Sequence, residues 1–186
     1  MSALAPADFV FVDECGTHVA LPPLYAWAPR EERAHGAVPR NRGRDLTPIA
    51  ALTAAGGGAA MTLDGAADGS AFAAYVREVL VPSLRPGQVV ILDNHSIHKG
   101  AAARALVEAA GCALLFLPPY SPDFNPIERA FSKRKAHLRR AGARTRDALQ
   151  AAIASALDTL SRADARAWFA QAGYHLPPEP SNLSAT

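Results

Sequence analysis

Three acidic residues stand where the chain could build a metal site. Asp13 and Asp93 each end a short apolar run, Phe9–Asp13 and Val89–Asp93, and Glu128 follows a segment rich in proline. Carboxylates delivered by rigid elements are what a protein needs to hold two divalent cations against a phosphodiester. The pattern therefore predicts metal-dependent phosphoryl transfer on nucleic acid, with these three acids as catalytic residues and metal ligands.

The elements that must position these acids can be predicted from the apolar pattern. The runs before Asp13 and Asp93 are continuous and too short for helices, which is typical of buried strands. The remaining predicted elements are strands Leu46–Thr53 and Ala59–Leu63 joined by a turn at Gly56–Gly58, helix Asp68–Leu84, helix His98–Ala110, strand Ala113–Leu117 and a helix that starts near Asn125. The fold class is therefore α/β, with three antiparallel strands, then parallel strands, and flanking helices.

Asp13 and Asp93 are expected to lie side by side. Ligands of an open α/β sheet collect at the carboxyl ends of its central strands, so two acids on adjacent parallel strands could share one cation. Without a cation, two close carboxylates repel each other and one pKa rises. The alternatives are that Asp13 is a strand-end turn residue and that Asp93 with Asn94 forms an Asx turn.

Glu128 has two interpretations. Asn125, Pro126 and Glu128 fit the N-cap, first and third positions of a helix, so the acid could serve only as a capping-box residue. However, four prolines stiffen the segment Leu117–Pro126, which is more rigidity than a cap requires. A stiff connection places one carboxylate reproducibly, as a metal site demands.

A strongly basic segment follows Glu128. The formal net charge of the whole chain is only +2, yet residues 129–146 contain eight Lys or Arg and no acid. Such a stripe is typical of a protein that binds a polyanion. We expect DNA contacts from Arg129, Lys133, Arg134, Lys135, Arg139 and Arg140, and from Arg40, Arg42 and Arg44 in a loop that could equally be merely solvated.

The last predicted helix should turn its apolar face to the sheet. Ile127, Phe131 and Leu138 share that face, whereas Lys133, Arg134 and Arg139 should point elsewhere. The alternative for the basic run is an ordinary solvated helix face.

Several polar neighbours could support the acids. Glu14 should point to the face of the sheet opposite Asp13, in a structural or supporting role. Asn94 and His98 are further supporting candidates, although a histidine at a helix start can equally have no such role. Glu78, on the first helix, fits a plain amphipathic surface better than a catalytic position. Cys15 and Cys112 lack metal-site spacing and are expected to be reduced thiols.

The totals limit the class of protein. At 186 residues, the chain fits one domain, expected over residues 1–176 and followed by a disordered tail at 177–186. No apolar stretch approaches the roughly 20 residues that span a bilayer, and the first residues do not have the pattern of a signal peptide. We therefore expect a cytoplasmic protein with no membrane partner.

Longer motifs carry a family resemblance. The blocks Phe11–Gly16, Leu92–His95 with His98, Leu117–Arg129 and Trp168–Tyr174 resemble the catalytic domain of bacterial insertion-sequence transposases related to the mariner superfamily, within the DDE superfamily of endonucleases. The resemblance covers about Phe9 to Tyr174. It implies a ribonuclease H-like fold, an Asp13, Asp93 and Glu128 triad, and Mg²⁺ or Mn²⁺ as cofactor, with two ions expected.

The resemblance also implies partners. DNA, as transposon ends and target, is the expected substrate, and a homodimer is the expected active complex. Members of the family normally carry helix-turn-helix segments before the catalytic domain, whereas here the first predicted catalytic strand begins at Phe9. We therefore expect recognition of the ends to come from a separate DNA-binding polypeptide, from a missing upstream reading frame, or not at all. Two alternatives stay open: a stand-alone nuclease or resolvase of the same fold, and a non-catalytic remnant that only binds DNA.

Overall fold

The sheet has five strands in the order β3-β2-β1-β4-β5. In the computed structural model, which describes residues 4–178, the strands are β1 (Phe9–Glu14), β2 (Leu46–Thr53), β3 (Gly56–Asp64), β4 (Val89–Leu92) and β5 (Ala113–Phe116). β1 pairs antiparallel with β2 and parallel with β4; β2–β3 is antiparallel and β4–β5 parallel. The predicted mixed sheet is confirmed. The tail expected to be disordered lies outside the described residues from residue 179 onward.

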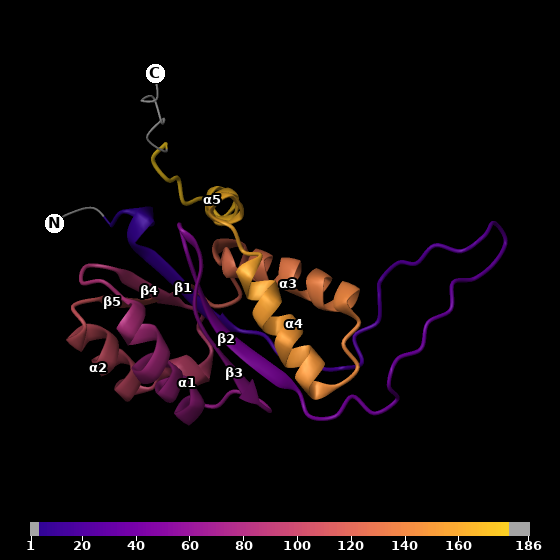
Figure 1. Ribbon diagram of the computed structural model, residues 1–186. Helices are drawn as coiled ribbons and strands as arrows, with labels where there is room; N and C mark the ends of the chain where they lie inside the picture. Colours follow the sequence, from indigo (N-terminus) through magenta and orange to yellow (C-terminus); the bar gives the residue numbers. More distant parts are fainter. Residues whose placement is uncertain (1–3, 179–186) are drawn as a thin grey trace, which may run out of the picture.

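Helices cover both faces of this sheet (Figure 1). They are α1 (Gly69–Tyr75), α2 (Ala101–Ala109), α3 (Ile127–Ala141), α4 (Arg146–Asp158) and α5 (Arg162–Gln171). α1 continues into a π-helical segment, Val76–Leu80, and a 3-10 turn, Val81–Ser83. Its N-cap residue, Asp68, accepts hydrogen bonds from two backbone amides. α4 and α5 were not predicted. None of the described helices has the length and apolar character that a bilayer crossing requires.

Alternation along β1 sends its side chains into two cores. Val10 and Val12 are buried with residues of α1 and α2, whereas Phe9 and Phe11 are buried with residues of α3 and α5. Because successive strand residues point to opposite faces, Asp13 continues the face of Phe11 and Glu14 the other. The two neighbouring acids are therefore delivered to different helical layers, as predicted.

The glycine triplet is not a turn. Gly56 begins β3 at φ +124°, and the turn lies at the two alanines before it. A Cβ atom at Gly56 would stand 2.9 Å from the carbonyl oxygen of Leu160, between α4 and α5. The missing side chains thus let the α4–α5 connection pack directly on the strand.

Gly56→Ala is expected to destabilise the fold by about 2–3 kcal/mol, because it forces a left-handed backbone on alanine and pushes Leu160 away. Urea unfolding followed by circular dichroism measures the loss. Gly36→Ala is the matched control, since a Cβ there meets nothing within 4 Å. Equal midpoints for the two variants would contradict the close approach.

Candidate active site

Asp13 and Asp93 lie next to each other at the carboxyl ends of adjacent parallel strands. The last register pair of β1 and β4 is Val12 with Leu92, so the two aspartates follow it at the same level. Asp13 is buried and Asp93 half-buried. The expected adjacency is therefore present, with one acid inside the protein and one facing its surface.

Glu128 meets Asp93 in one cavity. This cavity, of about 390 Å³, is lined by Asp93, Asn94, His95, Leu117, Pro118, Pro119, Tyr120, Ser121, Pro122, Asn125 and Glu128. Glu128 also lines a second cavity, of about 380 Å³, with Arg129 and Trp168. The acid thus lines both cavities, and Pro118, Pro119 and Pro122 of the proline-rich segment line the first.

Asn125 does not cap α3 with its side chain, contrary to the sequence prediction. Pro126 occupies the cap position without a side-chain cap bond, and the amide of Asn125 donates to Asp13 Oδ2 at 3.0 Å. The buried Asp13 carboxylate has a stronger need for a donor than an exposed helix end. Glu128 makes no capping-box bond in the described structure, so its carboxylate is available to the cavity.

His98 joins two acids from different strands. Its Nδ1 lies 2.6 Å from Asp93 Oδ1 and its Nε2 lies 2.9 Å from Glu14 Oε2. Burial lowers the pKa of His98, but the bonds to the two carboxylates outweigh it and raise the pKa to about 9. The hydrogen bond from His98 in turn holds the pKa of Asp93 below its usual range. His98 therefore favours the ionised form of Asp93 and links that acid to Glu14. That Glu14 and His98 support a catalytic site stays a prediction.

The pKa of Asp13 is raised, in contrast to that of Asp93. Burial first, and then the charges of Asp93, Glu14 and Glu128, raise the pKa of Asp13 to about 7, against a 2.8 Å hydrogen bond from the Glu14 amide. Mutual repulsion among acids that face one region is what a divalent cation relieves, and carboxylate oxygens are the donors that Mg²⁺ and Mn²⁺ prefer. The donor set therefore fits such ions. Among residues 4–178, however, no three acidic, histidine or cysteine side chains are close enough to surround one ion.

Arg134 lies inside the protein, so the prediction that it contacts DNA does not agree with the structure. Its side chain is 0% exposed, Nη2 donates to the Cys15 carbonyl at 2.8 Å, and the guanidinium stacks over Phe131. Arg134 falls seven residues after Ile127 and therefore belongs to the buried stripe of α3. Helical spacing could have revealed this position.

Other basic residues of the segment also have structural partners. Lys133 binds Asp164 and the Thr159 carbonyl, Arg144 donates to the carbonyls of Val19 and Leu21, and Arg146 pairs with Asp64. Arg129 and Arg140 are exposed, and Lys135 and Arg139 are half-buried. Only about half of the basic segment is therefore free to meet a polyanion.

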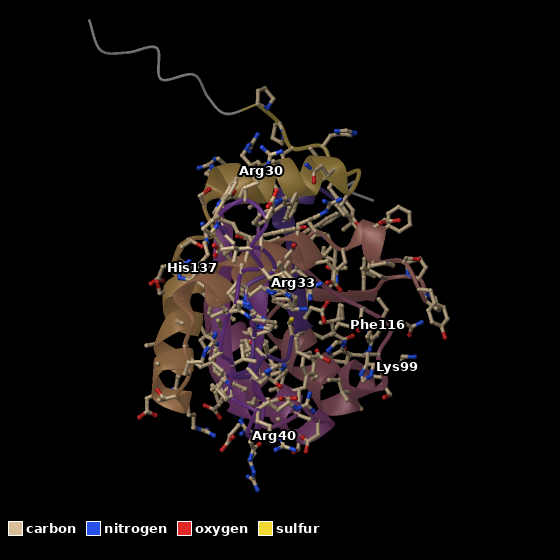
Figure 2. All side chains as sticks on the ribbon, turned by 90° about the vertical axis from the view of Figure 1, so that its right-hand side faces the viewer. Arg30, Arg33, Arg40, Lys99, Phe116 and His137 are labelled. Carbon is tan, nitrogen blue, oxygen red and sulfur yellow. The ribbon has the colours of Figure 1, made fainter. Side chains whose placement is uncertain are left out.

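The predicted loop arginines stand on a long excursion, residues 18–45, that projects beyond α3 and α4 (Figure 1). We call it the projecting loop. A bridge between Thr17 and Leu46 closes its base. Arg40, Arg42 and Arg44 are exposed, and Figure 2 shows Arg30, Arg33 and Arg40 spaced along the loop.

The Lys133–Asp164 pair makes a testable contribution to stability. The hydrogen bonds from Lys133 and Ser161 lower the pKa of Asp164 to about 2. Because this value lies below that of the unfolded chain, the contribution is full above about pH 4 and is lost as the pH falls towards about 2. In urea unfolding at pH 2 to 6, Asp164→Asn should be less stable than the parent by about 1 kcal/mol at pH 6. A gap that stays constant down to pH 2 would contradict the assignment.

Residues 8–150 match a family model described as DDE superfamily endonuclease. The chain belongs to this family. The match spans β1 to β5 and all three predicted acids. No curated protein matches the sequence.

The fold of the chain is also similar to solved structures of transposase and intasome complexes. The Mos1 transposase paired-end complex with the left transposon end matches with a TM-score of 0.68 at 15% identity, over 89% of this chain and 52% of that one. The catalytic domain of Mos1 mariner transposase matches with 0.59 at 12% identity, over 90% and 76%. A simian T-cell lymphotropic virus intasome complex matches with 0.58 at 14%, over 100% and 62%. The DDE chain therefore has the ribonuclease H-like fold of transposase and integrase catalytic domains, and it spans about half the length of the Mos1 chains in the complexes.

Proposed function

We propose that this chain catalyses DNA strand cleavage and strand transfer as the catalytic domain of a transposase. The observation that carries the proposal is the meeting of Asp93 and Glu128 in one open cavity, beside Asp13 on the neighbouring strand, in a member of the DDE family. Asp13, Asp93 and Glu128 would hold two Mg²⁺ or Mn²⁺ ions. Mos1 paired-end complexes with Mg and with Mn are among the similar solved structures.

The supporting residues have distinct roles in this proposal. When bound, the ions would activate water or a 3′ hydroxyl and stabilise the leaving oxygen of a phosphodiester. His98 occupies Asp93 Oδ1, which also accepts the His95 amide, and so leaves Oδ2 for a ligand. Asn125 orients Asp13 from the α3 side. A transposable DNA element has two ends that must both be cut. The active complex would therefore contain a second copy of the chain.

Separating nicking from joining tests the function. The full chain is incubated with a supercoiled plasmid and a labelled duplex that ends in a free 3′ hydroxyl, with Mg²⁺, Mn²⁺ or EDTA. Metal-dependent transfer of the label to the plasmid supports a transposase. Nicking without transfer would identify a nuclease or resolvase instead. DNA binding without either reaction would identify a remnant.

DNA binding should depend on salt less steeply than the full charge of the basic segment implies. With about four of its eight cations free, the slope of log K against log [salt] should be about −3 to −4, at about 0.9 per contact. Fluorescence anisotropy with a labelled duplex from 50 to 300 mM NaCl measures it. Arg140→Ala should flatten the slope by about one, whereas Arg146→Ala, which removes a partner of Asp64, should leave it unchanged. A slope near −7 would mean that further cations, either the paired ones of the segment or the exposed arginines of the projecting loop, also reach DNA.

A further inference from the structure

Tyr120 stands in solvent at the wall of the cavity that holds Asp93 and Glu128. Its exposure is 102%, and within residues 4–178 its ring and hydroxyl have no packing or hydrogen-bond partner. Aromatic side chains contribute most when their faces are covered. The ring therefore adds nothing to the stability of this chain.

The backbone at Tyr120 makes the exposure more unusual. Its φ is +56°, a left-handed conformation that costs a non-glycine residue about 1–2 kcal/mol. Glycine at this position would avoid the cost without losing any contact. Backbone strain at a cavity wall that no packing contact or hydrogen bond compensates indicates a functional use of the side chain.

The segment that carries the ring is stiff. Pro118, Pro119 and Pro122 fix the path, and Ser121 Oγ donates to the Pro119 carbonyl at 3.2 Å. Farther along, the Tyr174 hydroxyl donates to the Phe124 carbonyl at 2.9 Å. The ring is therefore presented by a fixed support, at a constant place relative to the acids.

We propose that Tyr120 is the stacking platform for a nucleobase of the DNA strand whose phosphodiester enters the cavity. This inference rests on the proposed function and adds a base-binding site to it. A bare aromatic face accepts any base, whereas the bases inside an intact duplex are already stacked on each other. The platform therefore requires an unpaired or frayed nucleotide beside the scissile phosphate, and favours DNA whose end is opened over fully paired DNA.

The test compares binding of two DNA probes that differ only in whether one unpaired base is present. The full chain is titrated, in Ca²⁺ buffer, with a duplex carrying a four-nucleotide 3′ overhang that contains 2-aminopurine, and with the same duplex carrying an abasic site there. The parent should quench 2-aminopurine and bind the base-containing probe about tenfold more tightly than the abasic probe. Tyr120→Phe should keep both effects. Tyr120→Ala and Tyr120→Gly should lose both, although glycine removes the backbone strain.

The controls separate this inference from the proposed function. Trp27→Ala removes an equally exposed ring on the projecting loop, away from the cavity, and should keep the base preference. If Tyr120→Ala still prefers the base-containing probe, the stacking platform is overturned but the proposed function is not. Analytical ultracentrifugation tests whether the ring instead belongs to a contact between copies of the chain. If Tyr120→Ala changes the protein from dimer to monomer and keeps the base preference, the platform is also overturned. Failure of the parent to bind either probe overturns the proposed function as well.

Discussion

Glu128→Gln is expected to lower metal-dependent DNA cleavage by about 10³-fold while leaving the fold intact. Removing one carboxylate ligand forfeits several kcal/mol of transition-state charge stabilisation, and each 1.36 kcal/mol is a factor of ten in rate. Glu128 is exposed and makes no cap bond, so the change removes little stability. Asp13→Asn and Asp93→Asn should have equally large effects. Plasmid nicking in Mg²⁺, with circular dichroism on the same samples, measures both quantities.

Glu78→Gln is the matched control for this substitution. Glu78 is an exposed acid that pairs with its neighbour Arg77 on the π-helical segment, outside both cavities beside Glu128. It should cleave at the parental rate. Retained cleavage in any of the three acid variants, or loss of cleavage in Glu78→Gln, would show that the ligand set is assigned wrongly.

Phe169→Ala should destabilise the protein by about 3–5 kcal/mol, the usual cost of emptying a large aromatic position in a core. Phe169 is fully buried on α5, and its ring meets Phe11 of β1 edge to face at a centroid distance of 5.3 Å. The residues matched by the family model end at 150, before this helix. The prediction thus tests whether α5 belongs to the same cooperative unit as the acids. Differential scanning calorimetry and urea unfolding measure the loss.

Gln171→Ala provides the comparison on the same helix. Its side chain is exposed, so the change should stay within about 0.5 kcal/mol. A second transition in Phe169→Ala, with the sheet melting at its parental midpoint, would mean that α5 folds as a separate layer.

The sheet could be predicted from the sequence because its signals are local. Short apolar runs, turn residues and a predicted helix between the strands at Val89 and Ala113 specify the strands and the parallel pairing of β4 with β5. The adjacency of Asp13 and Asp93 depended on the further assumption that β1 and β4 are neighbours, which the structure supplies. α4 and α5 were missed: the apolar residues of α4 are largely alanines, so its buried stripe, Leu149, Ile153 and Ala156, contrasts weakly with the rest of the helix.

Side-chain choices within the site could not be predicted in the same way. Asn125 fits a helix cap by sequence, yet its amide donates to an acid 112 residues away, because burial of Asp13 makes that bond more valuable. The hydrogen bond between Glu14 and His98 joins residues that are 84 positions apart. The sequence predicts a supporting role for each residue but not the bond between them. Residue types and spacing thus predict the acids, whereas the tertiary structure decides which side chains form hydrogen bonds with them.

The central position of β1 has a consequence for how the chain is made. The first strand pairs with β4, some 80 residues later, and its Phe11 packs on Phe169, near the end of the described chain. Contacts of such sequence separation form slowly, because the entropy of closing the loop is lost before any contact compensates for it. A chain still on the ribosome cannot complete its core until α5 has emerged. The core on the α5 side of β1, the face that Asp13 continues, is therefore completed only after most of the described chain has been synthesised.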